Sequence, residues 1–497
     1  MWEEEYPLPG YQSNTERYAT LQFITLGIGS TWFVGGDFAG GYAICASIAA
    51  LSLFFYFFLG QEVVISTSQD QKRFRRWLLV PLLFMILWPV SQLSPTITEY
   101  AIGDRNYLTF IEPDGVGPVT SILGHHWQPS LYLSMMLIAA IGYTAFTVSH
   151  YAITRTLWVL LINATVLGAV GLLTSIMHWE KILSFITPAQ ANFFSTFPSA
   201  HQWSAFALFW TVVGFGLFFH LKRRQTWTSL LEKNGAWLIA GWLILAYSAY
   251  ETGTPFHRFL LGISVGLILL RIGTALVRYM RTGFVAGLMG ILLLLAGISA
   301  IGYNLFNFAN EFSLAQSDPS RAPFGIPWGT QLALWRDTWQ LFLERPFFGW
   351  GAGSFQDIFP FHQQVDLGNF EYTSPHSDIL HVLFEYGIVG LCLLLTFPIV
   401  IAFKFAFLKQ RRMVSHYLWG AVTLLVLLSL FCQPLSTPAN LACLWFGIAA
   451  AYKWSEIEPV TPKSFSAKNN GATSETEKDK RKSRPRRSSQ KSKRSVN

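Results

Sequence analysis

The sequence has few charged side chains for its length. Of its 497 residues, only 13% are Asp, Glu, Lys or Arg, whereas 52% are hydrophobic and 16% are aromatic. A soluble chain of this size would need more polar side chains to cover its surface. The composition therefore predicts a polytopic membrane protein.

Cysteine is also scarce, which argues against a disulfide framework and against a cysteine metal site. All four cysteines lie inside apolar runs, where cysteine acts as a small packing residue. They are Cys45, Cys392, Cys432 and Cys443. The adjacent histidines His125 and His126 have no convergent carboxylate and make a poor ligand set. We therefore predict no metal and no cofactor.

The N-terminus lacks the basic residues that begin a secretory signal peptide. It reads MWEEEYPLPG, with three glutamates. The first apolar run is therefore expected to remain in the protein as a membrane span.

Apolar windows long enough to cross about 30 Å of hydrocarbon recur along the chain. Twelve are predicted, and the expected fold is all-α with a large outward loop between spans nine and ten. The windows are 19–36, 40–60, 77–95, 129–150, 157–177, 203–220, 236–251, 258–277, 283–304, 386–408, 416–434 and 436–453. The first two flank GDFAG, and they could instead form a re-entrant hairpin.

Basic clusters predict the orientation, because Lys and Arg in short loops stay in the cytoplasm. The clusters are KRFRR at 72–76, KRR at 222–224, Arg278 with Arg281, KQRR at 409–412, and the C-terminal tail. All fall on one side of a twelve-span chain, so both termini are expected in the cytoplasm. The outward loops are then 96–128, 178–202, 252–257 and 305–385. The expected organisation is a short N-terminus (1–18), a membrane domain (19–453) and a tail (454–497).

The net charge of +8 belongs to this tail. From residue 461 onward there are 12 Lys and Arg and 3 Asp and Glu, giving +9, so the rest of the chain carries about −1. The tail has almost no apolar content and is predicted to be disordered. We expect it to rest near anionic membrane lipids, and we assign it neither nucleic-acid binding nor catalysis.

The outward loop before span ten is too long to be a plain connection. Within GTQLALWRDTWQLFLERPFFG, the residues Leu332, Trp335, Trp339 and Phe342 follow helical spacing, which predicts an amphipathic helix on the membrane surface. The next segment, GWGAGSF, places glycines at 349, 351 and 353. No βαβ pattern surrounds them, so a tight structural turn is favoured over a dinucleotide site.

One pattern runs through this loop and into the next span: an arginine, a proline with a Gly-x-Gly-x-Gly-aromatic turn, then a histidine followed by Leu, Glu, Gly and Gly. The residues are Arg336, Pro346, Gly349, Gly351, Gly353, Phe355, His376, Leu380, Glu385, Gly387 and Gly390. This pattern resembles the signature of the O-antigen ligase and polymerase superfamily. An earlier Ser-Arg-Gly stretch of the family corresponds to TGTPFHRFLLG, in which Arg258 fits the arginine but His257 and Phe259 replace its neighbours. Ser377 stands where the family usually has asparagine.

The resemblance implies a multi-spanning C-type glycosyltransferase that takes a glycan from a polyprenyl pyrophosphate carrier at the outer membrane face. The residue chemistry agrees with this. Arginine has a planar fork suited to phosphate oxygens, so Arg336 and Arg258 are the candidate pyrophosphate ligands. His376 is the candidate general base for the acceptor hydroxyl. Asp378 and Glu385 could orient it or the acceptor, and direct displacement would invert the anomeric carbon.

Structural interpretations of the same residues stay open. Arg336 could simply pair with Asp337 on a surface helix. His376 could be a helix-end histidine beside a capping serine. His201 could line an acceptor cleft or anchor its helix at the interface beside Trp203.

Two other functions also remain. Twelve spans suit a secondary transporter, for bicarbonate or another small solute, although no internal repeat or midplane charge pattern is visible. The second alternative function is that of a non-catalytic component of glycan assembly. The acceptor, whether lipid, glycan or protein, is not encoded in any pattern that we find.

Overall fold

The computed structural model describes most of the membrane domain. The described residues are 14–32, 43–51, 94–95, 97–102, 105–111, 119–120, 148, 150–179, 193–222, 236–278, 284–364, 372–407 and 413–455. The chain divides into two units, Met1–Ser455 and Glu456–Asn497, and all described residues belong to the first. Most of the predicted windows 77–95 and 129–150 lie outside the described residues. So do His125 and His126, the GDFAG linker, most of the basic clusters and nearly all of the tail.

Helices dominate the described part of the chain. They are α1 (Asn14–Trp32), 43–51, α6 (His150–Ile176), α7 (Ala200–Lys222), α9 (Ala236–Thr252), α10 (Pro255–Arg278), α11 (Phe284–Ser317), α12 (Trp328–Glu344), α13 (Phe355–His362), α14 (Asp378–Phe407), α15 (Met413–Phe431), η4 (Pro434–Ser436) and α16 (Pro438–Ser455). Six of them contain segments that are long and apolar enough to cross a membrane. The prediction of a polytopic helical membrane protein is therefore confirmed. The predicted twelve crossings are not all within the described residues.

Four short strands depart from the all-α expectation. Strands β2 (Ile97–Ile102) and β3 (Arg105–Phe110) form an antiparallel pair, with Ile97 opposite Phe110. Strands β1 (Ser94–Pro95) and β4 (Val119–Thr120) pair in parallel. All four lie in or beside the loop predicted at 96–128. They were not predicted, because none of these segments is an apolar window long enough to span a membrane.

Helix α7 lies at the centre of the bundle. It packs against α6, α9, α10, α15 and α16, and its span is largely buried within the protein. Large side chains such as Trp203, Phe206 and Trp210 fill this core. Because α7 is held on several sides, residues at its first turn have a fixed position.

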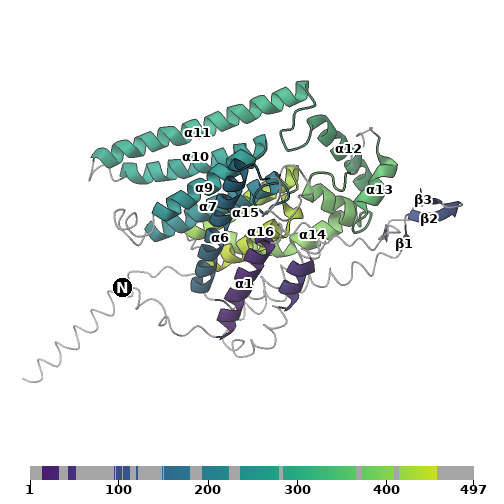
Figure 1. The fold of residues 1–497 in the computed structure, drawn as a ribbon, viewed down its shortest axis with the longest axis horizontal. Coiled ribbons are helices and arrows are strands. Elements are labelled where there is room, and N and C mark those ends of the chain that lie inside the picture. The colour runs from purple at the N-terminus through teal and green to yellow at the C-terminus, as the bar shows by residue number, and fades with distance from the viewer. Residues whose placement is uncertain are drawn as a thin grey trace, which may run out of the picture. The chain divides into compact units, whose positions relative to one another are not determined.

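Helices α10 and α11 lie side by side as a long antiparallel pair (Figure 1). Glycines allow their backbones to approach: a Cβ at Gly273 would lie 2.8 Å from the Gly290 carbonyl oxygen, and one at Gly297 would lie 2.9 Å from that of Gly266. Small residues serve close helix packing in membranes in this way. Helix α11 continues to Ser317, well past the predicted end at 304. It is about 50 Å long at 1.5 Å per residue, so the connection before span ten starts later than predicted.

Helix α14 is broken near its first third. Gly387 has φ 64° and ψ −169°, a conformation that is not helical. The segment 346–351 supplies hydrogen bonds on both sides of the break: Pro346 and Phe347 carbonyls accept from the amides of Ile388 and Val389. Broken membrane helices need such partners for their freed backbone groups. The same helix begins at Asp378, eight residues before the predicted window, because a polar first turn was not counted as part of the span.

A small core joins α12, α13 and the first part of α14. Its buried side chains are Val119, Leu334, Leu341, Trp350, Phe355, Ile358, Phe359 and Phe384. The predicted helix at 332–342 is present as α12, but its buried face differs from the predicted stripe. Leu332 and Trp339 are 45% and 47% exposed, whereas Leu334 is fully buried. The exposed pair remains free to meet lipid.

Candidate functional site

A cavity of about 250 Å³ lies where the first turns of α7 and α10 meet the segment before α14. These places fall in three loops that the basic clusters predict to face outward. The lining also includes parts of the α11–α12 and α15–α16 connections. It consists of Ser199, His201, Gln202, His257, Phe324, Gly325, Ile326, His376, Cys432, Gln433 and Pro434. Three histidines from distant parts of the chain therefore share one cavity.

His376 has a left-handed backbone, with φ 55°. This conformation is unusual for a residue with a side chain and costs about 1–3 kcal/mol unless its surroundings impose it. The carbonyl of Pro375 accepts a bond from the indole Nε1 of Trp335, 3.1 Å away. The Ser374 hydroxyl bonds to Gln433 Oε1 at 2.5 Å. Both residues before His376 are thus fixed to other elements.

The residues after His376 are fixed as well. The Ser377 hydroxyl accepts from the amide of Leu380, 3.3 Å away, and so caps α14. The Asp378 amide donates to the carbonyl of Cys432. Its carboxylate accepts from the amide of Leu435 at 2.9 Å. The capping serine that the sequence left open, Ser374 or Ser377, is therefore Ser377, and this cap is compatible with a site role for His376.

Burial and the nearby His201 lower the pKa of His376 to about 4. Burial is the larger cause, because a charged imidazolium loses its hydration there. His376 is consequently neutral at physiological pH. Its Nδ1 has no hydrogen-bond partner among the described residues, so the ring retains an unused nitrogen.

His257 lies in the first turn of α10 and is almost fully buried. Its Nδ1 is 2.7 Å from the Thr254 hydroxyl oxygen, and that oxygen also receives the His257 amide at 3.4 Å. Its Nε2 is buried and has no partner in the described part of the chain. Thr254 thus fixes the ring while one nitrogen remains unused.

His201 stacks near His257, with ring centroids 6.2 Å apart. Gly325, whose φ is +113°, passes directly against the His201 ring. A Cβ at this glycine would lie 3.2 Å from Cδ2 of that ring. His201 Nδ1 is a further buried atom with no partner among the described residues. The cavity thus brings together His376 and His201 of the predicted residues, and adds His257.

Arg336 lies on α12 and does not line the cavity. Its guanidinium contacts Asp337 Oδ1 and Gln364 Oε1, each at 3.3 Å, and 56% of its side chain is exposed. The predicted pair with Asp337 is present. Much of the cation nevertheless stays open to an anion outside the protein.

Arg258 follows His257 but faces α9. Its Nε donates to the Tyr250 carbonyl at 2.9 Å, and its guanidinium lies 5.1 Å from the centroid of the Tyr250 ring. Successive helical residues point about 100° apart, and Arg258 does not line the cavity that His257 lines.

The two candidate carboxylates also have partners away from His376. Asp378 anchors the start of α14 through Leu435, as described above. Glu385 Oε1 lies 3.1 Å from Nε2 of His381, one turn earlier on α14, and its side chain is buried. The structure therefore places neither carboxylate against the His376 ring.

The three glycines of the predicted turn all have positive φ: 70° at Gly349, 102° at Gly351 and 69° at Gly353. A Cβ at Gly349 would lie 2.5 Å from the carbonyl carbon of Glu385. The Gly351 amide donates to the Glu385 carbonyl at 2.9 Å. The glycine turn at 349–353 thus packs against the backbone of α14 beside its break at Gly387.

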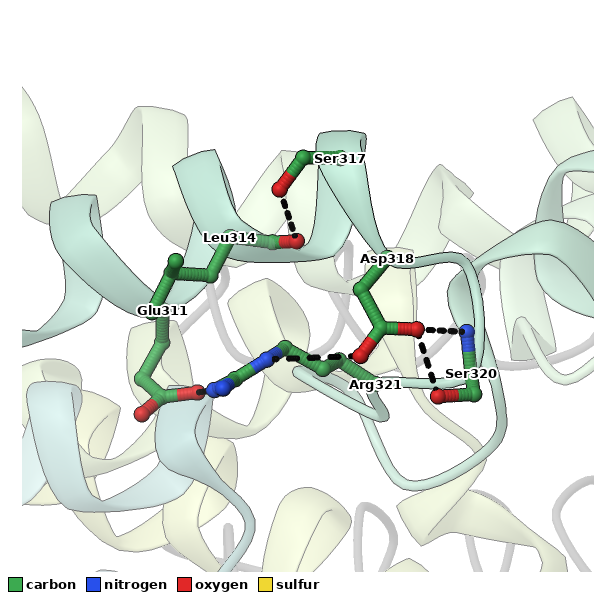
Figure 2. A network of polar contacts seen from close by, with 6 residues as sticks. All are labelled: Glu311, Leu314, Ser317, Asp318, Ser320 and Arg321. Atoms are coloured by element: carbon green, nitrogen blue, oxygen red, sulfur yellow. Dashed lines mark hydrogen bonds and ion pairs between the residues drawn. The ribbon is translucent and has the colours of Figure 1, made fainter.

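The loop that carries Gly325 is anchored by a charged network, which Figure 2 shows. Arg321 bonds to Glu311 Oε2 at 3.0 Å and approaches Asp318 Oδ2 at 3.8 Å. Ser320 donates to Asp318 through both its amide and its hydroxyl. These bonds lower the pKa of Asp318. Arg321 thus contacts two carboxylates and is 40% exposed, whereas Arg336 pairs with the single carboxylate of Asp337 and is 56% exposed.

No group of three or more His, Cys, Asp or Glu side chains in the described ranges could hold a metal ion. The three cavity histidines therefore do not form a metal site with one another. The arrangement instead offers neutral hydrogen-bonding groups and one exposed arginine near the same end of the bundle.

Sequence reasoning missed His257, because the resemblance drew attention to Arg258 beside it. A signal was present. His201, His257 and His376 each follow a Ser or Thr by two or three residues at the start of a helix on one predicted face. Gln202, beside His201, and Gln433 were not predicted.

These features define a polytopic membrane protein with a neutral, histidine-lined cavity at one end of its helices. Residues 193–395 match the O-antigen ligase family, Wzy_C. This segment is thus similar to the O-antigen ligase family, which confirms the predicted resemblance. The matched segment includes His201, His257, His376 and both candidate arginines, whereas residues 432–434 lie beyond it. No curated protein matches the chain significantly.

Proposed function

We propose that the protein is a membrane glycosyltransferase of the O-antigen ligase or polysaccharide polymerase kind. It moves a glycan from a polyprenyl pyrophosphate carrier to an acceptor hydroxyl at the outer face of the bacterial cytoplasmic membrane. The observation that carries the proposal is His376, a neutral histidine with an unused ring nitrogen in a cavity of the family-matched domain.

In the proposed reaction, His376 removes the proton of the acceptor hydroxyl as its oxygen attacks the anomeric carbon of the donor. The bond between that carbon and the pyrophosphate oxygen breaks, and polyprenyl pyrophosphate leaves. Attack from the face opposite the leaving group inverts the anomeric centre. Positioned bases typically contribute about 10²- to 10⁴-fold to such rates.

The lowered pKa of His376 fits this role before the donor binds. A neutral imidazole can accept a proton across physiological pH, although a pKa near 4 makes it a weak base. A diphosphate brought close to the ring would raise that pKa again, because an anion stabilises the imidazolium. The base would then be strongest only when the donor is present.

The diphosphate is assigned to the rim and not to the cavity interior, since no Lys or Arg lines the cavity among the described residues. Arg336 is the better-placed ligand, because its guanidinium is largely exposed. Trp335, its neighbour, bonds to the residue before His376. Arg258 remains the second proposed ligand, and it would have to release the Tyr250 carbonyl to bind phosphate.

An apolar groove between α14, α15 and α16 suits the isoprenoid chain of the carrier. It measures about 400 Å³, and most of its lining is apolar, including Leu391, Leu395 and Val426. Its few polar residues include Asp378 and Gln433, and Gln433 also lines the histidine cavity. A carrier chain in the groove would therefore place its head group near His376.

The test is a transfer assay with the full chain in lipid nanodiscs. Lipid-linked glycan and envelope acceptor would be extracted from a deletion strain of the host and mixed with the protein in EDTA. We expect a glycosylated acceptor and released polyprenyl pyrophosphate by mass spectrometry. Transfer that requires an added divalent ion would contradict the arginine assignment. If proteoliposomes accumulate labelled bicarbonate and no transfer occurs, the protein is a transporter and the proposal fails.

A further inference from the structure

Four buried polar atoms of the cavity residues have no hydrogen-bond partner among the described residues. They are Nδ1 of His201, Nε2 of His257, Nδ1 of His376 and Oε1 of Gln202. A buried polar atom without a partner is energetically unfavourable. Four such atoms on residues that line one cavity indicate that a ligand with several hydrogen-bonding groups completes it.

Thr254 contacts both the backbone and the ring of His257. Its oxygen accepts the His257 amide, and its hydroxyl proton can be donated to the imidazole Nδ1, 2.7 Å away. We adopt the tautomer that this donation requires, in which Nδ1 is the acceptor and Nε2 carries the proton. With this tautomer, the unpartnered Nε2 of His257 is a hydrogen-bond donor, whereas Oε1 of Gln202 is an acceptor.

The described lining contains no Asp, Glu, Lys or Arg. A diphosphate would need cations, because burying an uncompensated anion is costly. Hydroxyl groups need only neutral donors and acceptors, which this cavity supplies. Its volume of about 250 Å³ equals that of roughly eight liquid waters, enough for one sugar residue and too large for a single side-chain hydroxyl.

We propose that His201, His257 and Gln202 bind the acceptor of the reaction, and that the acceptor presents a sugar residue to this cavity. This assignment rests on the proposed function. His257 donates from Nε2 to a sugar oxygen, Gln202 accepts from a sugar hydroxyl, and the hydroxyl that reacts lies against His376. Thr254 is a positioning residue, since it acts through the His257 tautomer.

Direct binding tests this assignment without knowledge of the natural acceptor. The full chain with ¹⁵N-labelled histidine would be placed in nanodiscs and titrated with methyl glycosides of glucose, galactose and mannose. N-acetylserine amide provides the single-hydroxyl comparison. Individual His→Gln substitutions identify the imidazole signals. We expect at least one glycoside to shift the signals of His201, His257 and His376 and to leave that of His362, on α13, unchanged.

Thr254→Val supplies the matched variant, because it keeps the shape of the side chain and removes the hydroxyl. It should shift the His257 signals in the unliganded protein and weaken glycoside binding about fivefold. Glycosides that leave all three cavity signals unchanged, or serine amide that shifts them equally, would overturn the assignment.

The proposed function is tested separately by transfer in His376→Ala. If that variant is inactive but no glycoside binds, only the sugar assignment fails. If glycosides bind but His376→Ala still transfers glycan, the assigned base is wrong while the sugar site remains.

Discussion

The fit between the glycine turn and the break in α14 makes Gly387→Ala a severe substitution. A Cβ at residue 387 would overlap the Phe347 carbonyl and lie 2.7 Å from the Phe348 amide nitrogen. These are backbone atoms, which cannot rotate away. The new side chain would also be forced into a conformation that is essentially restricted to glycine.

The expected loss of stability follows from these contacts. Moving the turn away from Gly387 breaks the bonds from Ile388 and Val389 to the carbonyls of Pro346 and Phe347, at about 1 kcal/mol each. The backbone conformation adds about 1–3 kcal/mol. Gly387→Ala should therefore destabilise the protein by about 3–5 kcal/mol, a large value for one methyl group.

Thiol-reactive dye fluorescence on heating is a suitable assay, because Cys45, Cys432 and Cys443 are buried and react only after unfolding. The control is Gly302→Ala in α11, where a Cβ would meet no atom within 4 Å. Alanine is favoured in a helix by about 0.5–1 kcal/mol, so this control should melt at or above wild type. Equal melting of the two variants would refute the role assigned to the turn.

Three further predictions concern charge, proton transfer and orientation. Arg336→Lys should lower transfer about tenfold or more, since a point charge cannot reproduce a bidentate phosphate contact. The control Arg321→Lys keeps a cation beside Glu311 and should have little effect. Equal effects of the two substitutions would contradict the assignment of Arg336 as a pyrophosphate ligand. The pH dependence of kcat/KM reports the free enzyme. Because His376 must be neutral to accept a proton and its pKa is lowered to about 4, kcat/KM should stay constant as the pH is lowered and fall only near pH 4. A fall that begins near pH 6.5 would contradict the lowered pKa of the base. Reporter fusions should place residues 222, 280, 410 and 480 in the cytoplasm and residues 115, 190 and 330 outside, and a cytoplasmic residue 330 would rule out an outer-face enzyme.

Hydrophobic windows located the long helices well, because each span must be apolar along its own length. They failed where a boundary depends on other features. Helix α14 begins at Asp378 because Ser377 caps a polar first turn, and α11 continues to Ser317 past its apolar part. Strands β2 and β3 contain no long apolar run, so hydrophobic windows could not predict them.

The cavity itself was only partly predictable. His376 and His201 were found from local context, but their meeting with His257 depends on tertiary packing of α7, α10 and α14, which no local periodicity encodes. The same holds for the turn at Gly349 and the break at Gly387, which are 38 residues apart by their numbers. Local sequence predicted a turn, and only the fold shows what it contacts.

The role of His376 as the base for glycan transfer is tested by His376→Ala. His178→Ala is the matched control, since His178 is also a histidine with positive φ, 50°, and it is exposed outside the cavity. At equal abundance in the membrane, we expect His376→Ala to lose about 10²- to 10⁴-fold in transfer and the control to lose none. Transfer by His376→Ala within a few-fold of wild type would contradict it.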